Sequence, residues 1–161
     1  MKAYLVIGIP ASGKTWVCTR LSDVYEYWPH DDWMFYDRQV SRYVEHILSK
    51  KNSPNTLLIE TPFSITAIKA PLEAAGMEVI PVFIVEKPEV ILTRYNARGK
   101  RDMPLGNLRR QETYEKIADE WRAFKGTSTE VLKHLVLAHE QSRPYSKVCA
   151  GCASKEPTWE R

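Results

Sequence analysis

The chain has 161 residues, of which 43% are hydrophobic and 27% are charged, and its formal net charge is +3. This balance is typical of one soluble globular domain with its own core, and the mild positive charge permits an anionic partner without requiring one. No apolar run approaches the about 18 residues that cross a membrane, the first apolar run is too short for a secretory signal, and a sparse, odd set of cysteines argues against a disulfide framework, so we expect a cytoplasmic protein.

Apolar runs alternate with amphipathic segments along the chain. The apolar runs predict strands over residues 3–7, 25–30, 56–60 and 77–86. Apolar residues at helical spacing predict helices over residues 14–24, 35–51, 64–75, 88–97, 107–124 and 127–137. Two prolines are unusual in this pattern, since Pro71 falls inside a helix and Pro81 inside a strand. Because helices supply the crossovers that parallel strands need, the alternation predicts an α/β fold: a parallel sheet flanked by helices.

The segment between the first strand and the first helix, GIPASGKT, matches the phosphate-loop pattern G-x-x-x-x-G-K-[ST] in full. In such a loop, backbone N–H groups surround an anion and the following helix directs its positive end at it. Lys14 would reach the β- and γ-phosphates of ATP, and the Thr15 hydroxyl would bind Mg²⁺. A chance glycine turn could match, but the strand before it and the helix after it favour a nucleotide site made of Gly8, Ile9, Pro10, Ala11, Ser12, Gly13, Lys14 and Thr15.

Acidic residues follow the second and third predicted strands. Asp31 and Asp32 form a pair near the end of the second strand, where one could accept a proton from an acceptor hydroxyl or could instead cap the next helix. Glu60 ends the third strand and could hold Mg²⁺ through water, contact substrate or be an ordinary strand-end carboxylate. In a parallel α/β fold these strand ends gather where ligands bind.

Four basic residues cluster after the fourth strand: Arg94, Arg98, Lys100 and Arg101. Arg94 and Arg98 are four residues apart and therefore share a helix face, and the guanidinium fork suits phosphate oxygens. A solvated basic surface is the alternative. Because Gly99 and Pro104 mark breaks in the helix pattern, we favour a basic lid that closes over the nucleotide, with Arg94 as a nucleotide contact.

In the order of these motifs the chain resembles the kinase domain of bacteriophage polynucleotide kinase over about residues 2–122. The family's loop is G-x-P-x-S-G-K-[ST], which Pro10 and Ser12 match, and its general base is the first residue of an Asp-Asp pair, which corresponds to Asp31. Its lid and following helix correspond to Arg94, Arg98, Gly99, Pro104, Leu108 and Arg109. The resemblance implies a P-loop kinase fold in which Asp31 deprotonates the acceptor, Arg98 binds the transferring phosphoryl and Lys14 neutralises the β- and γ-oxygens.

The departures from the family concern the acceptor. Met34 stands where the family has an arginine that grips a substrate phosphate, and Glu60-Thr61-Pro62 replaces Asp-Thr-Asn. Small phage kinases of 5-hydroxymethyluracil in DNA resemble this pattern, so DNA is the leading acceptor in this interpretation, contacted by Asp32, Glu60 and Trp33. Aromatic residues after the second and third strands could stack on an extruded base or belong to the core: Trp28, Trp33, Phe35, Tyr36 and Phe63. The alternatives are a polynucleotide 5′-hydroxyl, a nucleoside, nucleotide or other small metabolite, and a non-catalytic nucleotide-binding switch.

The last residues form a polar tail. We expect the kinase domain to span residues 1–139 and the tail residues 140–161. The tail carries Cys149 and Cys152, half of a zinc site whose nearest further ligands would be His134 and His139. Free thiols are the alternative to zinc.

Overall fold

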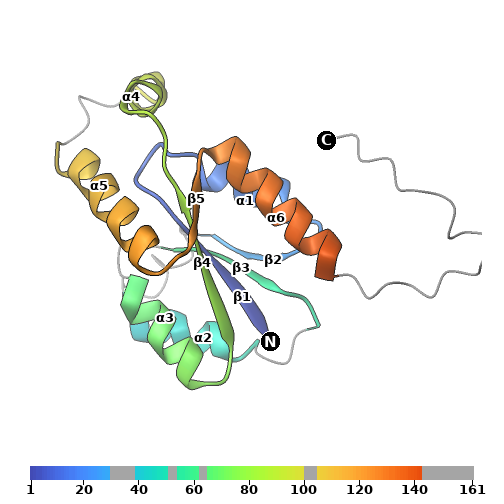
Figure 1. The fold of residues 1–161 in the computed structure, drawn as a ribbon. Helices are drawn as coiled ribbons and strands as arrows, with labels where there is room; N and C mark the ends of the chain where they lie inside the picture. The colour runs from blue at the N-terminus through green and yellow to red at the C-terminus, as the bar shows by residue number, and fades with distance from the viewer. Residues whose placement is uncertain (30–38, 51–53, 62–64, 100–104, 143–161) are drawn as a thin grey trace, which may run out of the picture.

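The described residues form one sheet of five parallel strands with helices on both faces (Figure 1). The computed structural model describes residues 1–29, 39–50, 54–61, 65–99 and 105–142. The strands lie in the order β2-β3-β1-β4-β5 and are β1 (Lys2–Ile7), β2 (Glu26–Trp28), β3 (Leu57–Glu60), β4 (Glu78–Ile84) and β5 (Phe124–Gly126). The helices are α1 (Lys14–Arg20), α2 (Val40–Leu48), α3 (Ile65–Ala74), α4 (Pro88–Ala97), α5 (Leu105–Glu120) and α6 (Ser128–Ser142).

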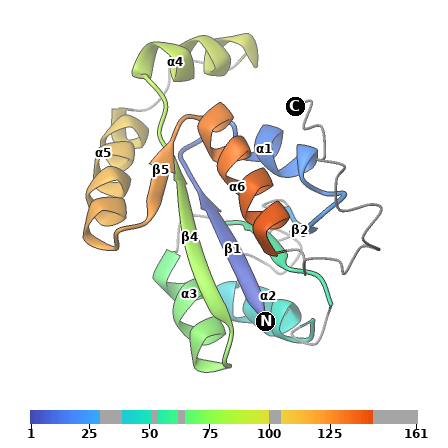
Figure 2. The same cartoon turned by 45° about the vertical axis from the view of Figure 1, so that its right-hand side comes forward.

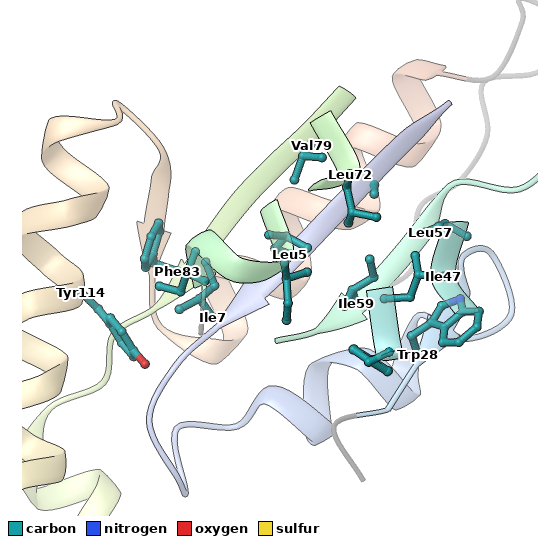
Figure 3. Packing of buried hydrophobic residues seen from close by; sticks show 14 of the residues in the cluster. Leu5, Ile7, Trp28, Ile47, Leu57, Ile59, Leu72, Val79, Phe83 and Tyr114 are labelled. Atoms are coloured by element: carbon teal, nitrogen blue, oxygen red, sulfur yellow. The ribbon is translucent and has the colours of Figure 1, made fainter. Parts of the chain in front are cut away.

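Alternate residues of the strands serve two separate hydrophobic cores. Leu5 and Ile7 of β1 face the core that α2, α3 and α5 cover, together with Phe83 and Tyr114 (Figure 3). Tyr4 and Val6, which alternate with these residues along β1, face the opposite core under α1 and α6. Because successive side chains of a strand point to opposite faces, a strand covered on both sides requires a continuous apolar run such as residues 3–7 of β1. The α/β prediction is therefore confirmed.

The parallel register brings the functional segments to one edge of the sheet. The phosphate loop follows β1, Glu60 ends β3, and Glu86 lies just beyond β4. Val6 of β1 pairs with Glu60, and Ile84 of β4 pairs with Gly126 of β5, so the strands end side by side. Helix α4 stands beyond this carboxyl edge, and Figure 2 shows it above α5 and β5.

Several element boundaries differ from the sequence prediction. Helix α2 is Val40–Leu48, with Gln39 as its N-cap, where the sequence predicts a helix over residues 35–51. The sequence predicts one helix over residues 107–124, but α5 ends at Glu120 and residues Phe124–Gly126 form the edge strand β5. Helix α1 ends at Arg20, because the chain turns through Leu21 and Val24 rather than continuing helically. Helix α6 continues to Ser142, beyond the end at residue 137 that the sequence predicts.

Both unusual prolines are accommodated. Pro71 lies inside α3, which runs on to Ala74. Strand β4 pairs with β5 only from Val82 to Ile84. Pro81 therefore has no partner strand on the β5 side, and proline is tolerated at such an edge position. None of the described helices is long and apolar enough to cross a membrane.

Candidate active site

The phosphate loop depends on two glycines. Gly13 has φ +104°, and a Cβ there would lie 2.9 Å from the Cβ of Ser128 at the start of α6. A Cβ on Gly8 would lie 2.4 Å from the Ser12 hydroxyl oxygen, which is itself fully buried. Ala11 also has positive φ, at 65°, and the Ser12 N–H donates to the Ile9 carbonyl at 3.1 Å. The two motif glycines are therefore required by contacts inside the protein as well as by the backbone conformation.

Lys14 is half-buried at the start of α1 and donates to the carbonyl oxygen of Gly8 at 2.5 Å. Burial lowers the pKa of Lys14 to about 8, the Glu60 carboxylate opposes this shift, and the charges of Arg98 and Arg110 add to it. The like charges of Arg98 and Arg110 disfavour the protonated form of Lys14. An anion with several charges would relieve that repulsion, which is the property expected of a polyphosphate site.

Thr15 and Glu60 place two side-chain oxygens of the kind that bind metal ions beside Lys14. The Thr15 hydroxyl donates to one oxygen of the Glu60 carboxylate at 2.8 Å, and the Tyr27 hydroxyl of β2 donates to the other. Glu60 is only 4% exposed, so its orientation is fixed by these donors. The Thr15 hydroxyl directs its proton at Glu60, so the lone pairs of its oxygen can face a cation. These oxygen donors fit Mg²⁺, which prefers hard ligands and retains water between itself and a carboxylate.

The two predicted lid arginines occupy different places. Arg94 lies against the phosphate loop, where its Nη1 donates to the Ser12 carbonyl at 3.0 Å and its Nη2 donates to the Ser128 hydroxyl at 3.4 Å. Nη2 also lies 3.6 Å from the carboxylate of Glu86. Arg98 follows α4 as its C-terminal cap and contributes its charge at Lys14. The loop 100–104, which carries Lys100, Arg101 and Pro104, lies outside the described residues.

Arg110 is a further candidate site residue, which the sequence interpretation did not single out. The resemblance pointed to Arg109, but Arg109 is exposed, whereas Arg110 is partly buried and its charge acts on both Lys14 and Tyr114. The signal was present in the helix spacing, because Arg110 stands four residues before the buried Tyr114 and therefore shares its side of α5.

Several predicted residues lie outside the described part of the chain. These are the acceptor-side residues Asp31, Asp32, Trp33, Met34, Phe35, Tyr36 and Phe63, and the tail cysteines Cys149 and Cys152. Of the other aromatic and zinc candidates, Trp28 is a core residue, 6% exposed, His134 stacks on Phe124 at 4.0 Å, and His139 contacts the ring of Tyr25. Among the described residues, no three His, Cys, Asp or Glu side chains are grouped so that they could hold a metal. Zinc binding by the tail stays a prediction.

We expect Gly13→Ala to cost more stability than Gly76→Ala. Both glycines have positive φ, which costs an alanine of order 1–3 kcal/mol, but only at Gly13 does the added methyl meet another residue. Urea unfolding measures the difference, and binding of an ATP analogue should be lost in Gly13→Ala alone. Equal destabilisation by the two substitutions, with binding retained in both, would contradict the close contact between Gly13 and Ser128.

Comparison with known proteins identifies the fold. Neither a protein-family model nor a curated protein sequence matches this chain. Among solved structures, a gluconokinase from Sinorhizobium meliloti 1021 is similar, with a TM-score of 0.58 and 18% identity over 87% of this chain and 92% of that one. Identity this low establishes the architecture alone and does not establish the substrate, and the match is not to the phage polynucleotide kinase family. The chain has the fold of a P-loop kinase.

Proposed function

We propose that this protein is an ATP-dependent kinase that transfers the γ-phosphoryl group to a hydroxyl of a small molecule. The observation that carries the proposal is that arginines of two further helices act at the phosphate loop. Arg94 of α4 donates to the Ser12 carbonyl at 3.0 Å. The charges of Arg98, which caps α4, and of Arg110 in α5 act on Lys14, which lies beside the Thr15–Glu60 pair. A nucleotide-binding switch needs the loop and the magnesium ligands, but it does not need additional cations from two further helices. Charge developing on a transferring phosphoryl group does need them.

The candidate site residues would have separate roles in this reaction. The loop amides and Lys14 bind the β- and γ-phosphates, and Lys14 must carry its proton to do so. Thr15 and Glu60 would hold Mg²⁺, which would supply positive charge to offset the negative charge of the phosphate groups. Arg98 and Arg110 stabilise the transferring group, while Arg94 flanks the loop on the nucleotide side. Asp31, which follows β2 in the sequence, is the proposed base for the acceptor hydroxyl.

The small-molecule acceptor is favoured by the structural neighbour and by surface charge. The similar solved protein is a gluconokinase, a small-molecule kinase. Helix α2, which follows β2, exposes Arg42 but also Glu45, and so presents no basic track on its described surface. A DNA acceptor normally requires several Lys or Arg contacts to its backbone phosphates.

A hydroxyl on DNA is the second candidate acceptor. Its support is the motif match, in which Pro10 and Ser12 occupy the loop and Arg94, Arg98 and Gly99 the lid in the order of the polynucleotide kinase family. Both the hydroxymethyl group of 5-hydroxymethyluracil and a 5′-hydroxyl belong to this candidate.

One transfer assay separates these proposals. ATP labelled in its γ-phosphate is offered with gluconate and other sugar acids, sugars, nucleosides, DNA containing 5-hydroxymethyluracil, DNA with a free 5′-hydroxyl, and RNA. We expect label in the small-molecule fraction. Label on DNA alone would replace the leading proposal by the second. Release of free phosphate with every acceptor would indicate an ATPase or switch.

We expect Arg98→Ala and Arg110→Ala to lower turnover more than ATP affinity. Loss of one group that stabilises transition-state charge costs about 10²–10³-fold, and we expect that for Arg98, with about 10- to 100-fold for Arg110. Steady-state kinetics with saturating acceptor measure both effects. Arg109→Ala is the matched control, because Arg109 is the exposed neighbour on the same helix. A loss of the same size in Arg109→Ala would contradict the assignment of Arg110.

We expect ATP affinity to fall as the pH rises from 7 to 9. Burial lowers the pKa of Lys14 to about 8 in the free protein, so above that pH the amine is largely neutral and must regain a proton when phosphate binds. One pH unit above the pKa this costs about tenfold in affinity. Calorimetry in buffers of different ionisation enthalpy should show uptake of about one proton at pH 9 and almost none at pH 7. Affinity that is constant over this range would contradict the lowered pKa.

A further inference from the structure

Glu86 is a buried carboxylate that the proposed reaction does not use. It lies just beyond β4 and is 7% exposed. Its Oε1 accepts the backbone N–H of Ser128 at 2.9 Å and the Ser128 hydroxyl at 2.7 Å. The Nη2 of Arg94 lies 3.6 Å from the same oxygen. A buried carboxylate is costly unless it is paired and hydrogen-bonded, and here it has both kinds of partner.

The backbone of Glu86 fixes a further helix at the same point. Its N–H donates to the side-chain oxygen of Gln111 at 3.3 Å, and the Gln111 amide nitrogen donates back to the Glu86 carbonyl at 2.8 Å. Gln111 is 5% exposed and belongs to α5, next to Arg110. The helix that carries Arg110 is therefore attached to the end of β4 by a reciprocal pair of hydrogen bonds.

Arg94 connects this junction to the phosphate loop. Its Nη1 donates to the Ser12 carbonyl, and the same nitrogen lies 3.3 Å from the place that a Cβ of Gly13 would occupy. Arg94 belongs to α4, the helix whose C-terminal cap is Arg98. Residue 86 thus joins α4, α5 and α6 to the loop that would hold the phosphates.

We propose that Glu86 is a positioning residue, which holds Arg94 and the first turn of α6 against the phosphate loop and thereby sets nucleotide affinity. The proposal rests on the function proposed above. Without the carboxylate, the Arg94 guanidinium loses its charged partner beside Ser128. The guanidinium is then less firmly held in the position from which it donates to the Ser12 carbonyl. The phosphate loop is then held less rigidly by α4 and α6. Part of the free energy of nucleotide binding must therefore be used to order the loop.

The test is Glu86→Gln, which keeps the shape and an acceptor oxygen for Ser128 but removes the charge that faces Arg94. We expect the dissociation constant of a non-hydrolysable ATP analogue to rise about tenfold, as expected for loss of a hydrogen-bonded partner of a charged group. Glu89→Gln is the matched control, because Glu89 is exposed in the first turn of the same α4. The KM for ATP should rise by the same factor, while the KM for the acceptor should not change.

A double-mutant cycle distinguishes positioning from packing. If Glu86 acts through Arg94, adding Glu86→Gln to the Arg94→Ala variant should raise the dissociation constant of the ATP analogue by less than a further factor of about two. Full additivity, or an unchanged dissociation constant in the folded single variant, would overturn the proposal. If Glu86→Gln does not fold, Glu86→Asp and Ser128→Ala replace it in the same cycle, and each must couple to Arg94. Binding of the analogue needs no acceptor, so a protein that binds ATP without transferring phosphate would defeat the proposed function and leave this test intact.

Discussion

The close approach of α6 to Gly13 is the constraint on which the rest of the site depends. A Cβ at Gly13 would lie 2.9 Å from Ser128, so the loop and the first turn of α6 can meet only because this residue has no side chain. That contact places Ser128 where its N–H and hydroxyl reach Glu86, and it brings Arg94 to the loop carbonyl of Ser12. The glycine of the phosphate motif therefore has two roles: it opens the loop to an anion, and it lets β5 and α6 pack behind the loop.

The charges of the site are arranged in two layers. In the phosphate loop, burial lowers the pKa of Lys14 to about 8, and the charges of Arg98 and Arg110 add to this effect. Behind, the buried carboxylates Glu60 and Glu86 each receive two donated hydrogen bonds from defined neighbours. Carboxylates that are fixed by donors can orient a metal ligand or an arginine without turning toward a phosphate, which they would repel. Positive charge thus remains concentrated where the phosphate groups would bind.

Features that depend on local pattern could be predicted from the sequence, and features that depend on tertiary contacts could not. The loop, the first four strands and α4 follow from motif and periodicity, and they lie where the pattern placed them. Strand β5 has only three residues, one of them a lysine and one a glycine, so its sequence carries no strand signal and only pairing with β4 defines it. In the sequence, Glu86 has the pattern of an ordinary polar residue at the end of a predicted strand. Its role could not be predicted because its partners Arg94, Gln111 and Ser128 come from three later helices.

Arg109 and Arg110 show why a motif match and a helix face can disagree. A motif aligns positions along the chain, whereas a charge acts at the site only from the side of the helix that faces it. Gln111, Tyr114 and Ala118 are the buried side of α5, and Arg110 borders that side while Arg109 points to solvent. Of the described arginines, Arg94 donates to the loop carbonyl of Ser12, and Arg98 and Arg110 act on Lys14 through their charge. Their effect on the site therefore depends on which side of each helix carries them.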